Sequence, residues 1–305
     1  MAGEPFTIPD AFARRTVAAF GEAGQEWLRT LPALVADLTR RWGVTLGAPF
    51  ALSYNYVAPA RRSDGSEAVF KAGVPSAELR RELYALRWYD GDGICRLLAA
   101  DDERCVMLLE RLRPGETLAP LVGVDDEAAT RIAAGVMARL WRPVPVGEPF
   151  LPVAQWFADA FDRHRREYGG AGPFPVAVFE RAEALVPELL ASAPREALLH
   201  GDLHHYNILT AERAPWLAID PKGVTGDPGY DVGQFFLNPD LGDVLAQAEV
   251  VRRRLDVFAE ELHYDRARLA AWAFAEVVLS ACWSAEEHGD GWQGAIAVAE
   301  TLLRL

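Results

Sequence analysis

The 305-residue chain contains few cysteines and no long hydrophobic run. Its three cysteines, Cys95, Cys105 and Cys282, show no metal-binding or redox spacing, which argues against a disulfide framework and favours the reducing cytoplasm. No stretch reaches the roughly 18 uninterrupted apolar residues of a membrane span, so we expect no membrane partner. The first residues, MAGEPFTIPDAFARR, lack a long apolar core, and we therefore expect no secretory signal.

Lysine is also scarce. Among 31 basic residues only Lys71 and Lys222 are lysines, and the rest are arginines. A lysine kept against this bias hints at a site that needs a compact ammonium group, which arginine cannot supply. The net charge of −13 disfavours nucleic acid as a partner and is compatible with a cationic one. An acidic balance also serves solubility alone.

The stretch LHGDLHHYNIL, residues 199–209, carries the clearest motif of the chain. His200, Asp202 and Asn207 follow the pattern H-x-D-x-x-x-x-N, and Asp220 ends the next short strand, WLAID. This spacing is typical of the catalytic loop of kinases. The alternative is an ordinary turn with a hydrogen-bonded histidine and a strand-capping Asp220. The joint spacing of all four residues favours the kinase interpretation.

Phosphoryl transfer explains why these residue types recur at this spacing. One carboxylate must receive the proton of a substrate hydroxyl, and Asp202 is the candidate for this catalytic base. An amide and a second carboxylate must hold the Mg²⁺ that screens the phosphates of ATP. Asn207 and Asp220 are the candidate metal ligands.

The region before this loop predicts helices followed by a small sheet. Apolar residues at helical spacing predict two helices within 10–42, with Pro32 bending or dividing the second and Gly43 ending it. Residues 44–74 alternate as strands, and Lys71 lies on the last of them. A hairpin followed by a strand lysine is how kinases cover and grip phosphates. This loop has no G-x-G-x-x-G, and Ser53 with nearby backbone N–H groups is the candidate phosphate contact.

A helix predicted over 76–88 offers a partner for the strand lysine. Glu78 and Glu82 lie four residues apart on one face, and either can pair with Lys71 and aim its ammonium group at ATP. We prefer Glu82, which is nearer the helix centre, although both can be solvated. A hairpin then leads to Arg113-Pro114-Gly115, which resembles a hinge between two lobes. Adenine is expected to bond to the backbone at Glu110 and Leu112.

The remainder is predicted to be mainly helical, over 125–140, 152–168, 175–192, 240–261, 265–287 and 292–304. Asp231 is a candidate brace of the catalytic loop through backbone N–H groups. Near the end, Glu286 and Glu287 are candidate partners of a cationic substrate, and Trp283 lies three residues before Glu286 on the same face. A solvated acidic helix end and a core tryptophan are the plainer alternatives.

Together these patterns predict an α+β fold with a small lobe and a larger one. The N-terminal lobe, residues 1–112, holds the first helices and the ATP-covering sheet. The larger and mainly helical C-terminal lobe, residues 113–305, holds the catalytic loop and the acceptor site. The expected ligands are ATP, Mg²⁺ and a small-molecule acceptor.

At HGDLHHYNIL the chain resembles the aminoglycoside phosphotransferases, whose usual loop is HGDxHxxN, and within them the streptomycin 6-phosphotransferase and hydroxyurea kinase branch. Supporting stretches include WLRTLPALVADLTRRWGV, LRWYDGDGICRLLAADDE and ERAPWLAIDPKGVTGDPGYD. The resemblance covers nearly the whole chain. It implies a bilobal fold like that of protein kinases. It also implies ATP-dependent O-phosphorylation, with Asp202 as the base, Asn207 and Asp220 on Mg²⁺ and Lys71 on phosphate. It also implies a backbone adenine site over 110–112.

Two features depart from that family pattern. His205 and Tyr206 stand where a small or Pro-Gly pair is common, and Lys222 stands where no fixed basic residue is expected. Both leave the reaction unchanged and bear on the acceptor. His204 lies where protein kinases place a lysine, which points away from protein substrates.

Three functions remain open from the sequence. The first is an aminoglycoside O-kinase that gives antibiotic resistance, which suits the acidic balance. The second is a kinase for another small hydroxylated molecule, such as hydroxyurea or a metabolite. The third is a nucleotide-binding module without transfer, which the complete set of Lys71, Asp202, Asn207 and Asp220 disfavours. We expect a monomer that binds neither nucleic acid nor membrane.

Overall fold

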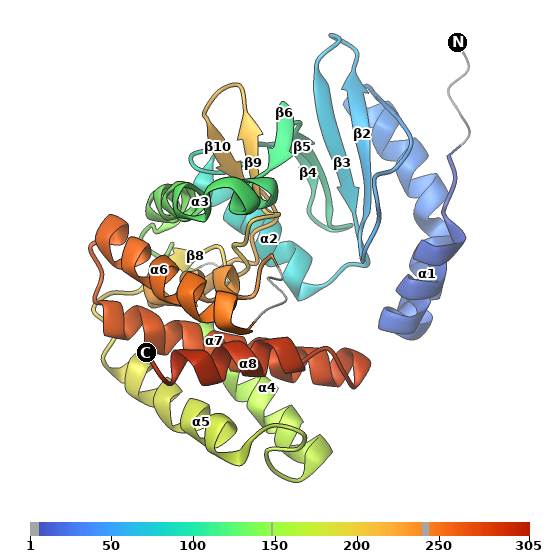
Figure 1. The fold of residues 1–305 in the computed structure, drawn as a ribbon. Helices are drawn as coiled ribbons and strands as arrows, with labels where there is room; N and C mark the ends of the chain where they lie inside the picture. Colours follow the sequence, from blue (N-terminus) through green and yellow to red (C-terminus); the bar gives the residue numbers. More distant parts are fainter. Residues whose placement is uncertain (1–5, 148, 240–243) are drawn as a thin grey trace. The chain divides into compact units, whose positions relative to one another are not determined.

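The computed structural model describes residues 6–147, 149–239 and 244–305, and the side chains of 244–247 and 287–288 lie outside the description. The chain separates into two compact units, Met1–Arg113 and Pro114–Leu305 (Figure 1). The first unit is built on a β-sheet and the second is mainly helical. The predicted α+β class, with a β-rich N-terminal part and a helical C-terminal part, is confirmed.

The first unit begins with α1, Asp10–Trp42, which consists of two helical segments as predicted, but the second segment is not divided at Pro32. The chain stays helical through Pro32, and the interruption is at Gly21, whose φ of 56° and ψ of −131° leave the helix. Glycine reaches positive φ without a steric penalty, whereas a proline removes one hydrogen bond and can be tolerated. Gly43, with φ 62°, ends the helix as predicted.

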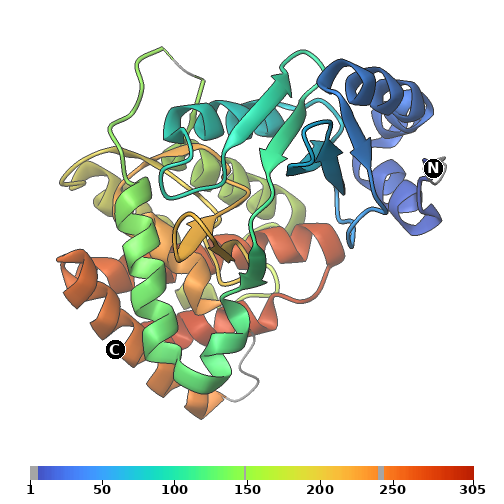
Figure 2. The same cartoon turned by 90° about the horizontal axis from the view of Figure 1, so that it is seen from above.

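A five-stranded antiparallel sheet follows, in the order β1-β2-β3-β5-β4. Its strands are β1 Val44–Leu46, β2 Tyr56–Arg62, β3 Glu67–Ala72, β4 Leu97–Asp101 and β5 Val106–Glu110. Helix α1 packs its apolar stripe, including Leu31 and Leu38, on one face of this sheet, against residues such as Phe70 (Figure 2). Because side chains alternate along a strand, Lys71 points away from that face.

Helix α2, Ala77–Tyr89, belongs to the same unit. Its N-cap is Ser76, whose hydroxyl accepts a hydrogen bond from the Leu79 N–H at 3.2 Å. The Lys71 side chain of β3 reaches Glu82 of this helix. The two faces of the sheet therefore differ. One face forms the hydrophobic core with α1, and the other carries the ion pair between Lys71 and Glu82.

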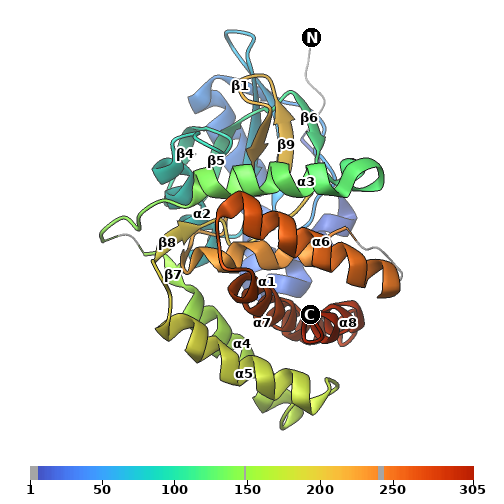
Figure 3. The same cartoon turned by 60° about the vertical axis from the view of Figure 1, so that its left-hand side comes forward.

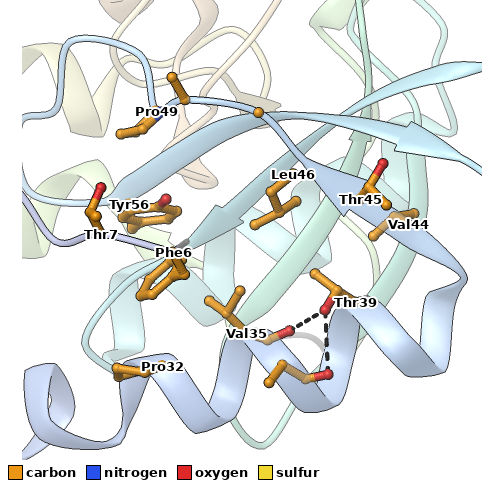
Figure 4. Close-up of a pocket in the computed structure, with 13 residues that line it drawn as sticks. Phe6, Thr7, Pro32, Val35, Thr39, Val44, Thr45, Leu46, Pro49 and Tyr56 are labelled. Atoms are coloured by element: carbon orange, nitrogen blue, oxygen red, sulfur yellow. Dashed lines mark hydrogen bonds between the residues drawn. The ribbon is translucent and has the colours of Figure 1, made fainter. Parts of the chain in front are cut away.

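A cavity of about 460 Å³ opens between α1 and β1 in this unit (Figure 4). Its lining is apolar apart from hydroxyl groups, of which Thr39 is already bonded to the carbonyls of Val35 and Ala36. None of its lining residues carries a charged side chain. This cavity therefore contains neither the carboxylate nor the lysine that phosphoryl transfer uses.

The second unit holds two small sheets and most of the helices. Its strands are β6 Pro114–Thr117, β7 Leu151–Pro152, β8 Ala197–Leu199, β9 Ile208–Ala211, β10 Trp216–Ala218 and β11 Val224–Gly226. The sheet orders are β10-β9-β6 and β7-β11-β8. The expected Pro-Gly break is thus itself a strand, β6, because it pairs with β9.

The α-helices of this unit agree with those predicted, except that residues 240–243 of one prediction lie outside the described residues, and a 3₁₀ helix over residues 228–236 was not predicted. They are α3 Ala119–Leu140, α4 Val153–Tyr168, α5 Val176–Ala191, the 3₁₀ helix η1 Pro228–Phe236, α6 Val244–Leu262, α7 Arg266–His288 and α8 Gln293–Leu302. Helix α3 starts earlier than expected because a first turn precedes an interruption at Asp125.

Helix α7 forms the centre of this unit, in contact with α4, α5, α6, α8 and η1 (Figure 3). Within the described residues, the stretch Arg266–Glu286 of α7 is long and apolar enough to cross a membrane, but 67% of an 18-residue segment of it is buried in the fold. A core helix has this composition because it must bury almost every side.

Candidate active site

The catalytic loop runs between β8 and β9, and buried His200 ties it to the segment after β10. His200 Nε2–H donates to the Ile219 carbonyl at 2.8 Å, and its Nδ1 accepts the Asp202 N–H at 3.2 Å. The Lys222 N–H donates to the His200 carbonyl at 2.7 Å. Burial lowers the pKa of His200 to about 3, so the ring is neutral and serves as a structural tie.

Asp231 of η1 braces this loop, as the sequence predicted. Its carboxylate accepts the N–H groups of His200 at 3.1 Å and Gly201 at 2.8 Å, and the Trp141 indole N–H at 3.1 Å. Burial raises the pKa of Asp231 to about 6, and these three donors oppose the rise. Gly201 has φ 84°, and a Cβ there would lie 2.8 Å from Val224 Cγ2, so only glycine fits this turn.

Asp202 and Asn207 face each other across the loop. The Asn207 amide nitrogen donates to the Asp202 carbonyl at 3.0 Å, which leaves its Oδ1 as the end that can bind a cation. The Asp202 side chain is 28% exposed, and its Oδ1 lies 3.7 Å from His204 Nε2. Burial lowers the pKa of His204 to about 4, so this neighbour carries no charge at neutral pH. Asp202 can therefore meet a substrate hydroxyl.

Asp220 follows β10 in a conformation that is rare for a residue with a side chain, with φ 66°. Strands β9 and β10 pair in antiparallel register, and the Ile219 N–H donates to the Asn207 carbonyl at 2.9 Å. The hairpin thus brings Asp220 beside Asn207. The negative charge of Asp220 raises the pKa of His204, against the effect of burial. Backbone strain of this kind is common where a side chain must be aimed.

These two residues fit a magnesium ion. Both offer oxygen donors, the hard ligands that Mg²⁺ prefers. Within the described part of the chain, no group of three or more His, Cys, Asp or Glu side chains could hold a metal. Asn207 and Asp220 would therefore share the ion with phosphate oxygens and water, as Mg²⁺ commonly does in phosphoryl-transfer sites.

The N-terminal unit supplies an almost buried lysine–glutamate pair. Lys71 Nζ lies 2.7 Å from Glu82 Oε1 and 2.8 Å from Oε2, with side chains 4% and 7% exposed. Glu82 is the partner that we preferred. The pair holds one ammonium group in a fixed place, and its role toward ATP stays a prediction.

The other predicted ATP residues lie in the same unit. Ser53 is exposed in the loop between β1 and β2, where Arg15 Nε donates to its carbonyl at 3.2 Å. Glu110 ends β5, and its N–H already donates to the Arg96 carbonyl at 2.8 Å. Leu112 is buried. A backbone adenine site would therefore use the Glu110 carbonyl and the Leu112 N–H.

Trp283 of α7 belongs to an aromatic group beside the catalytic loop. Its ring centroid lies 5.2 Å from that of Trp156 on α4. A Cβ on Gly201 would lie 3.4 Å from Trp156 Cζ3, so Trp156 packs against the residue before Asp202. Sequence reasoning missed Trp156, because nothing in its own helix indicates which loop it contacts.

Glu286, one turn further along α7, has a partner within the protein. Arg163 of α4 lies 2.9 Å from its carboxylate, and both side chains are about 40% exposed. A cationic ligand at Glu286 would therefore compete with Arg163, a residue that the sequence did not suggest. The side chain of Glu287 lies outside the described residues.

Glu276 of α7 is a further residue whose importance the sequence did not reveal. It is fully buried, and the negative charge of Asp202 contributes to its raised pKa. A signal existed, because Glu276 is the single charged residue between Arg268 and Glu286. A carboxyl group in such an apolar run requires a specific reason.

The sequence is similar to those of known proteins along most of the chain. The family model described as aminoglycoside/hydroxyurea antibiotic resistance kinase matches residues 41–289. A streptomycin 6-kinase of Streptomyces glaucescens is 39% identical over 286 residues, covering 92% of this chain and 91% of the relative. A hydroxyurea phosphotransferase of Kitasatospora aureofaciens is 37% identical over 305 residues, covering 99% of this chain and 87% of the relative.

A solved structure supports the fold. An aminoglycoside phosphotransferase, APH(4)-Ia, solved as a ternary complex with ADP and hygromycin B, aligns with a TM-score of 0.60 at 19% identity. The alignment covers 89% of this chain and 98% of that structure. The predicted kinase-like fold is thereby confirmed.

Proposed function

The chain belongs to the aminoglycoside/hydroxyurea antibiotic resistance kinase family, and we propose that this phosphotransferase moves the γ-phosphoryl group of ATP to a hydroxyl of a streptomycin-like aminoglycoside. Phosphorylation of that hydroxyl would inactivate the antibiotic and give resistance. The need for ATP also suits the cytoplasmic location expected from the sequence.

Asp202 is the proposed catalytic base. Its carboxylate would accept the hydrogen bond of the acceptor hydroxyl and take its proton as the oxygen–phosphorus bond forms and the bond to ADP breaks. The loop holds this carboxylate in place through Asp231, which binds the N–H groups of the two preceding residues. Such positioning matters because phosphoryl transfer depends mainly on alignment and charge stabilisation.

The remaining predicted residues would bind ATP. Lys71, held by Glu82, would contact its phosphates, Ser53 would contact them from the β1–β2 loop, and the backbone at Glu110 and Leu112 would bind adenine. Asn207 and Asp220 would hold Mg²⁺. The ion, when bound, supplies positive charge that screens the phosphate oxygens.

The acceptor is proposed to be cationic and to lie beside Trp156 and Trp283. Aromatic faces attract guanidinium and ammonium groups, and both rings are partly exposed near the loop. Glu286 would bind a second cationic group after displacing Arg163. Displacing Arg163 requires little free energy, because an exposed ion pair contributes only about 0–1 kcal/mol to stability.

This proposal rests on the structure of the catalytic loop. Asp202 is partly exposed there, and the Asp231 carboxylate accepts the backbone N–H groups of the two residues before it. The test is a coupled ADP-release assay with streptomycin, other aminoglycosides, hydroxyurea and small alcohols. Asp202→Asn should lower kcat by ~10²–10⁴ while ATP affinity stays nearly unchanged. Unchanged turnover would remove Asp202 as the base, and no stimulation by any aminoglycoside would refute the cationic acceptor.

A second candidate acceptor is hydroxyurea or another small uncharged hydroxylated molecule. The relative named hydroxyurea phosphotransferase spans 99% of this chain, and Arg163 already neutralises Glu286. In that case Asp202 would act in the same way, and Glu286→Gln would leave the KM for the acceptor unchanged.

A further inference from the structure

Glu276 combines complete burial with an incomplete set of hydrogen bonds. Its side chain is 0% exposed in the middle of α7. The Gln234 amide of η1 donates to Oε1 at 2.5 Å, whereas Oε2 has no hydrogen-bond partner among the described residues. A buried polar atom without a partner is uncommon in native proteins and requires a specific explanation.

The surroundings of Glu276 are acidic. The charged groups that act on it most strongly are Asp202 of the catalytic loop and Asp231 of η1, both carboxylates. The buried Tyr230 hydroxyl of η1 also lacks a partner among the described residues, and burial together with the charges of Glu276, Asp231 and Asp202 raises its pKa. An ionised Glu276 would add a further negative charge beside these two carboxylates.

Contacts through η1 link Glu276 to the loop that holds Asp202. A Cβ on Gly233 would lie 2.8 Å from Glu276 Oε2, so η1 and α7 approach each other closely at this point. Gln234 of η1 donates to Glu276, and Asp231 of η1 accepts the N–H groups of His200 and Gly201. A path of direct contacts therefore leads from α7 through η1 to the residue before Asp202.

We propose that Glu276 is a positioning residue for Asp202, acting as a neutral acid that joins α7 to η1 and loses this role when it ionises. The proposal rests on the proposed function only in taking Asp202 as the base. Burial and the neighbouring carboxylates raise the pKa of Glu276 to about 8, which agrees with a neutral acid at pH 7. Above that pH, repulsion from Asp231 would displace η1 and, with it, the catalytic loop.

Two substitutions separate the shape of Glu276 from its charge. Glu276→Ala loses the bond to Gln234 and should lower kcat about tenfold at pH 7, with the KM for ATP unchanged. Glu276→Gln keeps the shape without an ionisable proton and should restore most of that activity. The kcat of the wild type should fall as the pH rises through about 8, and the kcat of Glu276→Gln should not. Glu300→Gln, at an exposed site on α8, is the control that keeps the wild-type profile.

Three results would overturn the inference. The first is an alkaline fall in kcat that persists in Glu276→Gln. The second is a Glu276→Gln enzyme with a raised KM for the acceptor and an unchanged kcat at pH 7, since Glu276 would then be an anionic acceptor ligand. The third is the absence of a protonated carboxyl band from the infrared difference spectrum between wild type and Glu276→Gln at pH 7.

The infrared measurement needs no acceptor, so it decides the inference even if no aminoglycoside is phosphorylated. A present band together with inactive aminoglycosides would refute the proposed substrate alone. ATP hydrolysis by the wild type would then replace acceptor turnover in the pH profiles. If Glu276→Ala fails to fold, the pH profile of Glu276→Gln still decides the inference.

Discussion

Replacing Glu276 by glutamine should stabilise the folded protein at neutral and alkaline pH. The pKa of Glu276 rises from 4.5 to about 8 on folding, through burial and the charges of Asp202 and Asp231. Because one pKa unit corresponds to ~1.4 kcal/mol, this shift destabilises the folded state by about 4 kcal/mol at pH 8 and by about 3 kcal/mol at pH 7. Glutamine is neutral at every pH and can still accept the Gln234 hydrogen bond, so the variant avoids this cost.

The direction with pH follows from proton uptake. The unfolded chain loses the Glu276 proton near the ordinary value of 4.5, whereas the folded chain keeps it up to about pH 8. Folding therefore binds a proton between these values, and the free energy of unfolding falls as the pH rises through this window. Below pH 4.5 both states are protonated and the cost is absent. The advantage of the variant should therefore grow from acid to alkaline pH.

The measurement is urea unfolding followed by tryptophan fluorescence at about pH 5 and about pH 8.5, with equal m values as a check on comparability. Glu276→Gln should have a higher midpoint than the wild type, by a margin that is small at the lower pH and large at the higher. Glu300→Gln should match the wild type at both. A margin that is independent of pH, or a less stable variant at pH 8.5, would refute the reasoning.

Three other predictions concern substrates. Lys71→Arg should raise the KM for ATP or lower kcat strongly, because a planar guanidinium cannot replace a point charge held by a buried glutamate. Lys222→Arg should have a smaller effect. Equal tolerance of both substitutions in steady-state kinetics would mean that neither lysine contacts ATP. Asp220→Ala should abolish the Mg²⁺ dependence of ATP binding, and calorimetry showing wild-type dependence would refute its role as a ligand. Arg163→Ala should lower the KM for a cationic aminoglycoside, and Glu286→Gln should raise it. Both effects should be smaller in high salt, and the KM for ATP should not change. If neither variant alters the KM for the acceptor, Arg163 and the acceptor do not compete for Glu286.

Much of the local architecture could be predicted from the sequence. The kinase-like fold, Gly43 as a helix end and the bracing role of Asp231 were all recognisable, because each depends on residue type and short-range spacing. The motif around Asp202 was recognisable for the same reason. A tight loop and hairpin bring its residues together without help from distant parts of the chain.

Contacts between distant segments were decided only by the tertiary structure. Arg163 and Glu286 pair across 123 residues, and Gln234 meets Glu276 across 42. No spacing in the sequence indicates such a partner, because packing of whole helices selects it. Burial likewise determines the protonation of Glu276, since a carboxyl group has a raised pKa only where the fold removes water and places other carboxylates nearby. Residue type and spacing therefore determined which groups can react, and packing determined their partners and charge.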